Sequence, residues 1–103
     1  MAERALIDEA LAIAKALSDR TRLEILSRLA ARRSPMACLD LRESLKINAG
    51  TLSHHMGELE AAGLVEAERE GRCVNYVLRR DVLDRFAAGL REVFGAGEDQ
   101  PPR

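Results

Sequence analysis

Residues 45–78 read LKINAGTLSHHMGELEAAGLVEAEREGRCVNYVL, and the apolar pattern changes its period within this stretch. Up to Gly63, apolar side chains recur at the spacing of one helix face, which predicts a helix over 49–62. Asn48 is a favourable N-cap for this helix, and Gly63 suits the left-handed position that follows a helix end. The side chains expected to face inward are Leu52, Met56 and Leu59.

After Gly63 the sequence alternates with a period of two. In the first run, 65–70, small apolar residues or arginine alternate with glutamate, and a second run covers 73–78. The two runs flank the turn Gly71-Arg72, and this arrangement predicts a β-hairpin. The inner face of the second strand is expected to carry Val74, Tyr76 and Leu78.

Helical spacing also covers the segments on both sides of this stretch. It predicts helices over 3–17, 19–31, 36–45 and 80–94. Ser18 is expected to cap the helix 19–31, and Ser34-Pro35 to open the helix 36–45 as its N-cap and first residue. In these two helices the side chains expected to face inward are Leu23, Ile25, Leu26, Leu29, Leu39, Leu41 and Leu45, with Arg20, Arg22 and Arg28 on the polar side of the first.

The order of these elements predicts a fold that is mainly α with a β-hairpin wing. Helices 36–45 and 49–62 are joined by the three residues 46–48, which is the layout of a helix-turn-helix, and the hairpin behind them makes it a winged helix-turn-helix. We expect a single domain over 1–95. The segment 96–103 is rich in Gly, Pro and acidic residues and is expected to be a flexible C-terminal tail.

The composition excludes several classes of protein. The chain has 103 residues, of which 47% are apolar and 3% aromatic, and no apolar run approaches the roughly 18 residues that a membrane span needs. The N-terminus lacks the layout of a signal peptide, and two cysteines are too few for a disulfide scaffold, which favours a cytoplasmic protein. No nucleophile–base–acid set and no Gly-rich phosphate loop is visible, so we do not expect an enzyme.

Charge raises one objection to nucleic-acid binding. The formal net charge is −1, whereas many proteins that bind nucleic acids are strongly basic. However, no acidic residue occurs from Lys46 to Gly57, although 32% of the chain is charged. We therefore expect modest nonspecific affinity and binding that weakens readily with salt.

Four stretches together resemble the ArsR/SmtB family of regulators. Residues 16–26, ALSDRTRLEIL, are similar to its opening signature. TLSHHM at 51–56 and LEAAGLV at 59–65 resemble its recognition helix and the exit into the wing, and GRCVNY at 71–76 resembles its wing tip. The resemblance spans roughly residues 5–90. It implies a homodimeric winged helix-turn-helix repressor that leaves its operator on binding an effector, usually a thiophilic or divalent metal ion.

The helix 49–62 carries the residue types that a DNA-reading helix needs. Ala49 and Gly50 are small enough for close approach to phosphates, Thr51 and Ser53 can donate hydrogen bonds, and His54 can reach a base edge. The alternative for this helix is an ordinary surface helix with its polar residues outward, and the alternative for the wing is a solvated hairpin. The expected partner is double-stranded DNA, contacted by Asn48, Ala49, Gly50, Thr51, Ser53 and His54, and by Arg69 and Arg72 of the wing.

The metal sites of the family's known sensors do not carry over to this chain. Arsenic sensors have a Cys-x-Cys-Asp-Leu run, whereas residues 37–41 read ACLDL, with Ala37 and Leu39 at the two cysteine positions. The last helix has neither the Asp/His set of zinc sensors nor the cysteine of persulfide sensors. His54 and His55 are neighbours that point about 100° apart on a helix, so they cannot chelate one ion.

Two thiols therefore remain as candidate sensors. Cys38 and Cys73 are too few for a zinc or arsenite site without further ligands, so we predict no metal site and no cofactor required for DNA binding. Cys38 lies near a predicted helix N-terminus, where a thiolate is favoured, and would respond to thiophilic metals or oxidants. The alternative is that both cysteines are small buried hydrophobic residues.

The two terminal helices carry more apolar surface than a small monomer is expected to expose. They predict a homodimer, whose twofold axis would place two recognition helices on an imperfect palindromic operator. The alternative for the assembly is that the two helices simply cover each other. A separate alternative for the function is a winged-helix module for protein interaction without DNA binding, which the near-neutral charge would fit. The expected interface residues are Leu6, Ile7, Leu11, Phe86, Leu90 and Phe94.

Overall fold

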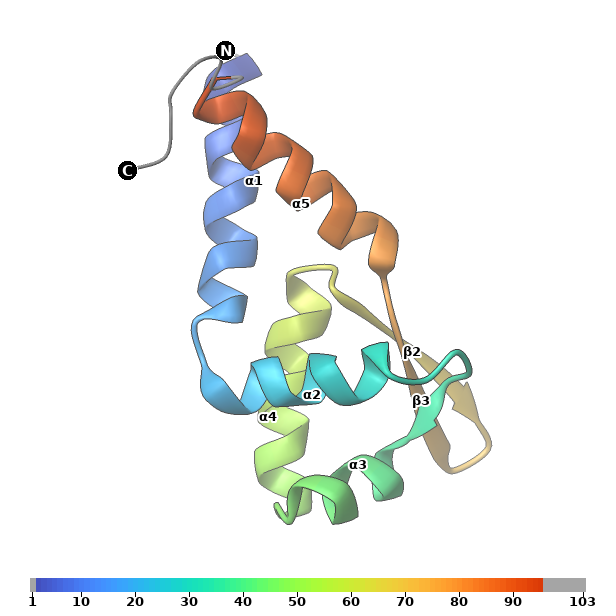
Figure 1. The fold of residues 1–103 in the computed structure, drawn as a ribbon. Helices are drawn as coiled ribbons and strands as arrows, with labels where there is room; N and C mark the ends of the chain where they lie inside the picture. Colours follow the sequence, from blue (N-terminus) through green and yellow to red (C-terminus); the bar gives the residue numbers. More distant parts are fainter. Residues whose placement is uncertain (1, 96–103) are drawn as a thin grey trace.

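The computed structural model describes residues 2–95 as five helices and a small antiparallel sheet (Figure 1). The predicted tail, 96–103, lies outside the described residues. The predicted helices and hairpin are confirmed, with bounds that differ by a few residues. In chain order the elements are α1 (Ala2–Leu17), α2 (Arg20–Ala30), β1 (Met36–Ala37), α3 (Cys38–Leu45), α4 (Ala49–Ala61), β2 (Val65–Glu70), β3 (Cys73–Leu78) and α5 (Arg80–Val93).

The sheet has a third strand, which the sequence pattern did not predict. β1 pairs antiparallel with β3, with Met36 opposite Tyr76, and the strand order is β1-β3-β2. The prediction that Ser34-Pro35 opens a helix was therefore wrong, since α3 begins at Cys38 with Ala37 at the N-cap and no side-chain cap bond. A strand of two residues is too short to show an alternating pattern, so only its tertiary partner reveals it.

The cap of α2 is also one residue away from its predicted position. Asp19 occupies the N-cap, and its Oδ2 accepts a hydrogen bond from the backbone N–H of Arg22 at 3.0 Å. Ser18, which was predicted to be the cap, instead donates from its hydroxyl to the carbonyl of Lys15 at 2.8 Å. Ser18 therefore closes α1, and a carboxylate, which suits the positive end of a helix, opens α2.

The core lies where α2, α3 and α4 pack against one face of the sheet. The six largest fully buried side chains are Ile25, Leu41, Leu52, Met56, Leu59 and Leu64. Two predicted core residues are wrong, because Leu23 is 49% exposed and Leu39 is 55% exposed. Each lies two positions before a buried residue of its own helix, Ile25 or Leu41, and residues two positions apart point about 200° apart on a helix. The predicted apolar stripe was therefore too wide.

The terminal helices α1 and α5 lie side by side at one end of the molecule (Figure 1). A Cβ added at Gly89 of α5 would lie 3.9 Å from Cδ2 of Leu6 in α1. None of the helices within residues 2–95 is long and apolar enough to cross a membrane.

Candidate nucleic-acid interface

The first half of α4 is held by its inner face and presents its outer face to solvent. Leu52, Met56 and Leu59 are buried, as predicted. The side-chain Oδ1 of Asn48 accepts from the backbone N–H of Thr51 at 2.8 Å and caps the helix. The predicted DNA-reading residues Ala49, Gly50, Thr51, Ser53 and His54 are all exposed.

Asn48 is exposed as well, and its side-chain oxygen accepts the cap bond. Its two amide N–H groups take no part in the cap and are available to donate to another molecule. Together with the exposed small residues that follow, Asn48 leaves an accessible helix N-terminus whose backbone dipoles favour anions. In the stretch from Lys46 to Gly57, no acidic side chain opposes this preference.

The turn before α4 is fixed by its backbone. Lys46 adopts a left-handed conformation with φ of 57°, and the backbone N–H of Ile47 donates to the carbonyl of Arg42 at 3.2 Å. The side chain of Arg28 in α2 donates from Nε to the hydroxyl of Ser44 in α3 at 2.6 Å. These bonds hold α3 at a set angle to α2 and α4, as a helix-turn-helix requires.

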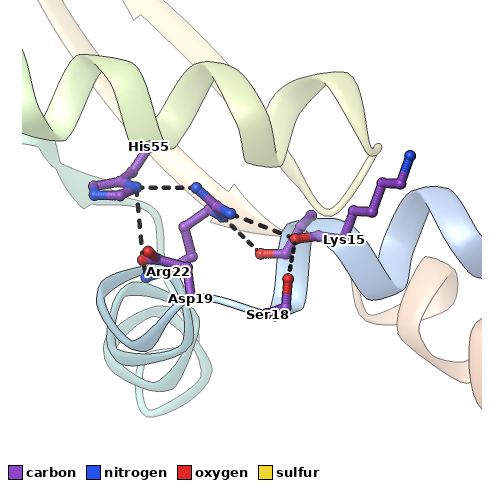
Figure 2. A network of polar contacts seen from close by, with 6 residues as sticks. Lys15, Ser18, Asp19, Arg22 and His55 are labelled. Atoms are coloured by element: carbon purple, nitrogen blue, oxygen red, sulfur yellow. Dashed lines mark hydrogen bonds and ion pairs between the residues drawn. The ribbon is translucent and has the colours of Figure 1, made fainter.

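A polar network joins α4 to the junction of α1 and α2 (Figure 2). Nη1 of Arg22 lies 3.2 Å from Nδ1 of His55, while Nε and Nη2 of Arg22 donate to the carbonyls of Ala16 at 2.7 Å and Lys15 at 3.4 Å. Because a guanidinium has only donors, Nδ1 of His55 is the acceptor in this contact. One arginine thus connects three helices.

The two neighbouring histidines occupy different environments. His55 is 12% exposed and its Nδ1 lies 3.8 Å from Oδ2 of Asp19, whereas His54 is exposed. The backbone N–H of Arg22 stabilises the Asp19 carboxylate and lowers its pKa, with a smaller contribution from the charge of the Arg22 guanidinium. The expectation that the two histidines do not form a metal pair agrees with this geometry, since His55 faces the scaffold.

The role of Arg22 does not follow from the sequence, in which helical spacing places Arg22 on the polar face of its helix. Arg22 is half-buried, and each of its side-chain bonds reaches outside α2. Asp19 at the cap three residues earlier was the available signal, but spacing alone cannot show that His55 lies opposite. Only the tertiary packing of α4 brings the two side chains together.

The wing presents both predicted arginines to solvent. Arg69 and Arg72 are exposed, and Gly71 between them has a φ of 61°, which the turn requires and glycine adopts without strain. Arg69 follows Ala67 on one face of β2, whereas its three glutamates alternate onto the other face. The glutamates are therefore separated from Arg69 by the pleat of the strand, although they are close in sequence.

The two cysteines differ in burial. Cys38 is half-buried at the start of α3 and packs against the core, whereas Cys73 at the start of β3 is exposed. The interpretation that both are buried hydrophobic residues was therefore wrong for Cys73, because its position at the tip of the hairpin has no covering layer. Among the residues that the structure describes, no group of three or more His, Cys, Asp or Glu side chains could hold a metal ion.

The predicted interface residues divide into two sets. Leu6 and Phe86 are half-buried and line the narrow space between α1 and α5, so part of the apolar surface of these helices is covered within the chain. The outer set lines a separate apolar groove on these helices. It consists of Ile7, Leu11, Leu90 and Phe94, of which Leu11 is 53% and Phe94 78% exposed.

The chain is similar in sequence to known helix-turn-helix regulators. A family model described as a helix-turn-helix domain matches residues 17–68. The arsenical resistance operon repressor of Staphylococcus aureus is 38% identical over 78 residues, which is 76% of this chain and 73% of that protein. An uncharacterised HTH-type transcriptional regulator of Bacillus subtilis is 32% identical over 80 residues, or 78% of this chain and 80% of that one.

Solved structures agree with the fold. An ArsR-like transcriptional regulator from Rhodococcus has a TM-score of 0.76 at 32% identity, covering 90% of this chain and 85% of that one. The solution structure of a homodimeric winged helix-turn-helix DNA-binding domain from Mycobacterium bovis, a possible ArsR-family regulator, has a TM-score of 0.70 at 31% identity. That match covers 97% of this chain and 92% of the other.

Proposed function

The chain belongs to the ArsR family of winged helix-turn-helix regulators, and from this premise we propose that it is a homodimeric, sequence-specific DNA-binding repressor. The observation that carries the proposal is the exposed, acid-free first half of α4, capped by Asn48 and followed by a wing with exposed Arg69 and Arg72. In this proposal the protein acts as a regulator in the cytoplasm and has no catalytic role.

The two DNA-contacting parts have different tasks. The start of α4 enters the major groove, where Thr51, Ser53 and His54 read base edges or bind phosphates and the small Ala49 and Gly50 allow close approach. Arg69 and Arg72 of the wing contact phosphates or the flanking minor groove, which positions the protein without reading sequence.

Dimerisation through α1 and α5 supplies a second recognition helix, which contacts the second half-site of the operator. The groove lined by Ile7, Leu11, Leu90 and Phe94 is an apolar surface that an isolated protomer leaves in water. A twofold mate would cover it with the same residues, and the operator would be an imperfect palindrome with half-sites about one helical turn apart. The relative from Mycobacterium bovis, described as homodimeric, supports this assembly.

The test is a gel-shift assay with the DNA upstream of the chain's own gene. The repressor proposal expects retardation that is sequence-specific and declines steeply with salt. Ser53→Ala is expected to weaken binding, whereas Ser27→Ala, which removes the same hydroxyl from an exposed position on α2, is not. If the wild type fails to retard this DNA or any palindromic fragment selected from a random pool at low salt, the interaction-module alternative replaces the repressor.

Release from the operator by an effector is part of the proposal. The exposed Cys73 and the half-buried Cys38 remain the candidate thiols for a thiophilic metal or an oxidant. A panel of metals and oxidants, read by release of operator DNA, tests this role. Unchanged release in Cys38→Ser and Cys73→Ser variants would remove both thiols from the mechanism.

A further inference from the structure

A pocket of about 630 Å³ lies away from the features described so far. It is bounded by the end of α2, the connector before β1, the end of β3 and the start of α5. Three arginines line it, Arg32, Arg33 and Arg80, together with Ser34, and no acidic residue does. In a chain with a net charge of −1, this pocket is a concentrated positive region.

One of the arginines is held in place by the fold. Nη2 of Arg80 donates to the carbonyl of Ala30, the last residue of α2, at 2.8 Å across 50 positions of sequence. A guanidinium has five N–H donors in a fixed fork, so Arg80 retains donors for a second partner. Within residues 2–95, the side chains of Arg32 and Arg33 form no hydrogen bond or ion pair with the protein.

The pocket is remote from the proposed DNA contacts. On β3 it is lined by Tyr76, Val77 and Leu78, in the half of the strand away from the wing turn at Gly71. The three steps from Cys73 to Tyr76 alone cover about 10 Å at roughly 3.3 Å each. Figure 1 shows the connector from α2 to β1 beside the strands, while α4 begins next to α3 at the bottom of the view. A phosphate bound by the wing turn would therefore not reach this pocket.

We propose that the pocket formed by Arg32, Arg33 and Arg80 binds a small organic anion with carboxylate or phosphate groups. Arginine forks bind both groups in a bidentate manner, with charge-assisted hydrogen bonds stronger than neutral ones. The volume falls within the range of about 300–1,000 Å³ that small-molecule sites occupy. Leu29, Ala31 and Val77 in the lining offer apolar contact to a carbon skeleton.

Calorimetric titration of the full chain tests the site. Citrate probes carboxylate binding and pyrophosphate probes phosphate binding, in separate titrations at one fixed ionic strength. We expect at least one probe to saturate at one site per chain, and Arg32→Ala/Arg33→Ala to weaken that binding at least tenfold. Arg32→Gln/Arg33→Gln, which keeps most of the side-chain bulk, is expected to show the same loss.

Two control variants separate the site from general charge effects. Arg85→Ala/Arg91→Ala removes the same charge from α5, and Arg72→Ala removes an arginine from the DNA-contacting wing; both are expected to keep wild-type anion affinity. The proposal is overturned if neither probe saturates with wild type, if the α5 control loses affinity equally, or if Arg72→Ala abolishes binding.

The DNA assay keeps this proposal separate from the proposed function. Arg32 and Arg33 lie outside α4 and the wing turn, so the pocket variants should retard operator DNA as wild type does. Failure of DNA binding in wild type alone would remove the repressor proposal and leave the anion titration unaffected. Failure of the titration with intact DNA binding would remove only the anion site.

Discussion

Arg22 in α2 donates from Nη1 to Nδ1 of His55 in α4 across 3.2 Å. The same guanidinium also donates to the carbonyl of Ala16 in the last turn of α1, where a cation is favoured by the helix dipole. The contact therefore fixes the proposed recognition helix against the helix pair that leads to the proposed dimer interface. His55 does not read DNA in this arrangement, since its ring nitrogen faces the scaffold.

We expect Arg22→Lys to lower the free energy of unfolding by about 1–3 kcal/mol, because an ammonium cannot reproduce the planar fork and leaves a half-buried acceptor without its partner. Thermal unfolding measures the change. A double-mutant cycle with His55→Ala should give a coupling energy of about 0.5 kcal/mol or more. Arg20→Lys, an exposed arginine on the same helix, is the control. Additive single-mutant effects would contradict a direct Arg22–His55 interaction.

Asn48 separates the stability of α4 from DNA binding. Asn48→Ala removes the bond to the backbone N–H of Thr51 and should cost about 1 kcal/mol. Asn48→Asp should keep the stability, since aspartate caps equally well, yet place a carboxylate where the helix meets phosphates. We expect Asn48→Asp to unfold at the wild-type temperature and to bind operator DNA much more weakly. Wild-type DNA binding by Asn48→Asp would mean that the start of α4 does not face the backbone of DNA.

Local pattern was sufficient for the main elements but not for contacts between them. Spacing and residue type predict the cap at Asn48, the inward side chains of Leu52 and Met56, and the hairpin around Gly71. Each of these features is decided by residues that are neighbours in sequence. β1 and the Arg22–His55 contact depend on partners that are far apart along the chain. Leu23 and Leu39 look like core residues by composition, and only the packing of α2 and α3 leaves them exposed.

Acid stability should depend on Asp19. The hydrogen bond from the backbone N–H of Arg22 lowers the pKa of Asp19 in the folded chain. The carboxylate of Asp19 therefore stabilises the fold fully above its unfolded pKa of about 3.9. This stabilisation is lost as the pH falls through the lowered pKa of Asp19 in the folded chain. Between about pH 6 and about pH 2, wild type should therefore lose more stability than Asp19→Asn, in which the cap cannot titrate. Glu24→Gln, on the exposed face of α2, is the control, and parallel curves for wild type and Asp19→Asn would refute the assignment.

Loss of Arg72 from the wing should make operator binding less dependent on salt. Arg72 is exposed beside the Gly71 turn, and a phosphate contact releases counterions from DNA. Arg72→Ala is expected to reduce the slope of log affinity against log salt by about one unit per bound protomer. Arg85→Ala on α5 removes an equal charge outside the proposed DNA contacts and should leave the salt slope unchanged. An unaltered slope in Arg72→Ala would place the wing away from the phosphates.

Two leucines of similar exposure, one inside the proposed dimer contact and one outside it, allow a matched test of the dimer. Leu11 lies in the apolar groove of α1 and α5 and is 53% exposed, while Leu39 on α3 is 55% exposed and lies outside the groove. A glutamate at position 11 would bury a charge without a partner in the proposed interface, which is strongly unfavourable. Light scattering at micromolar concentration should therefore give a dimer for wild type and Leu39→Glu and a monomer for Leu11→Glu. A monomeric wild type, or a Leu11→Glu variant that stays dimeric, would show that the groove of α1 and α5 is not the contact between protomers.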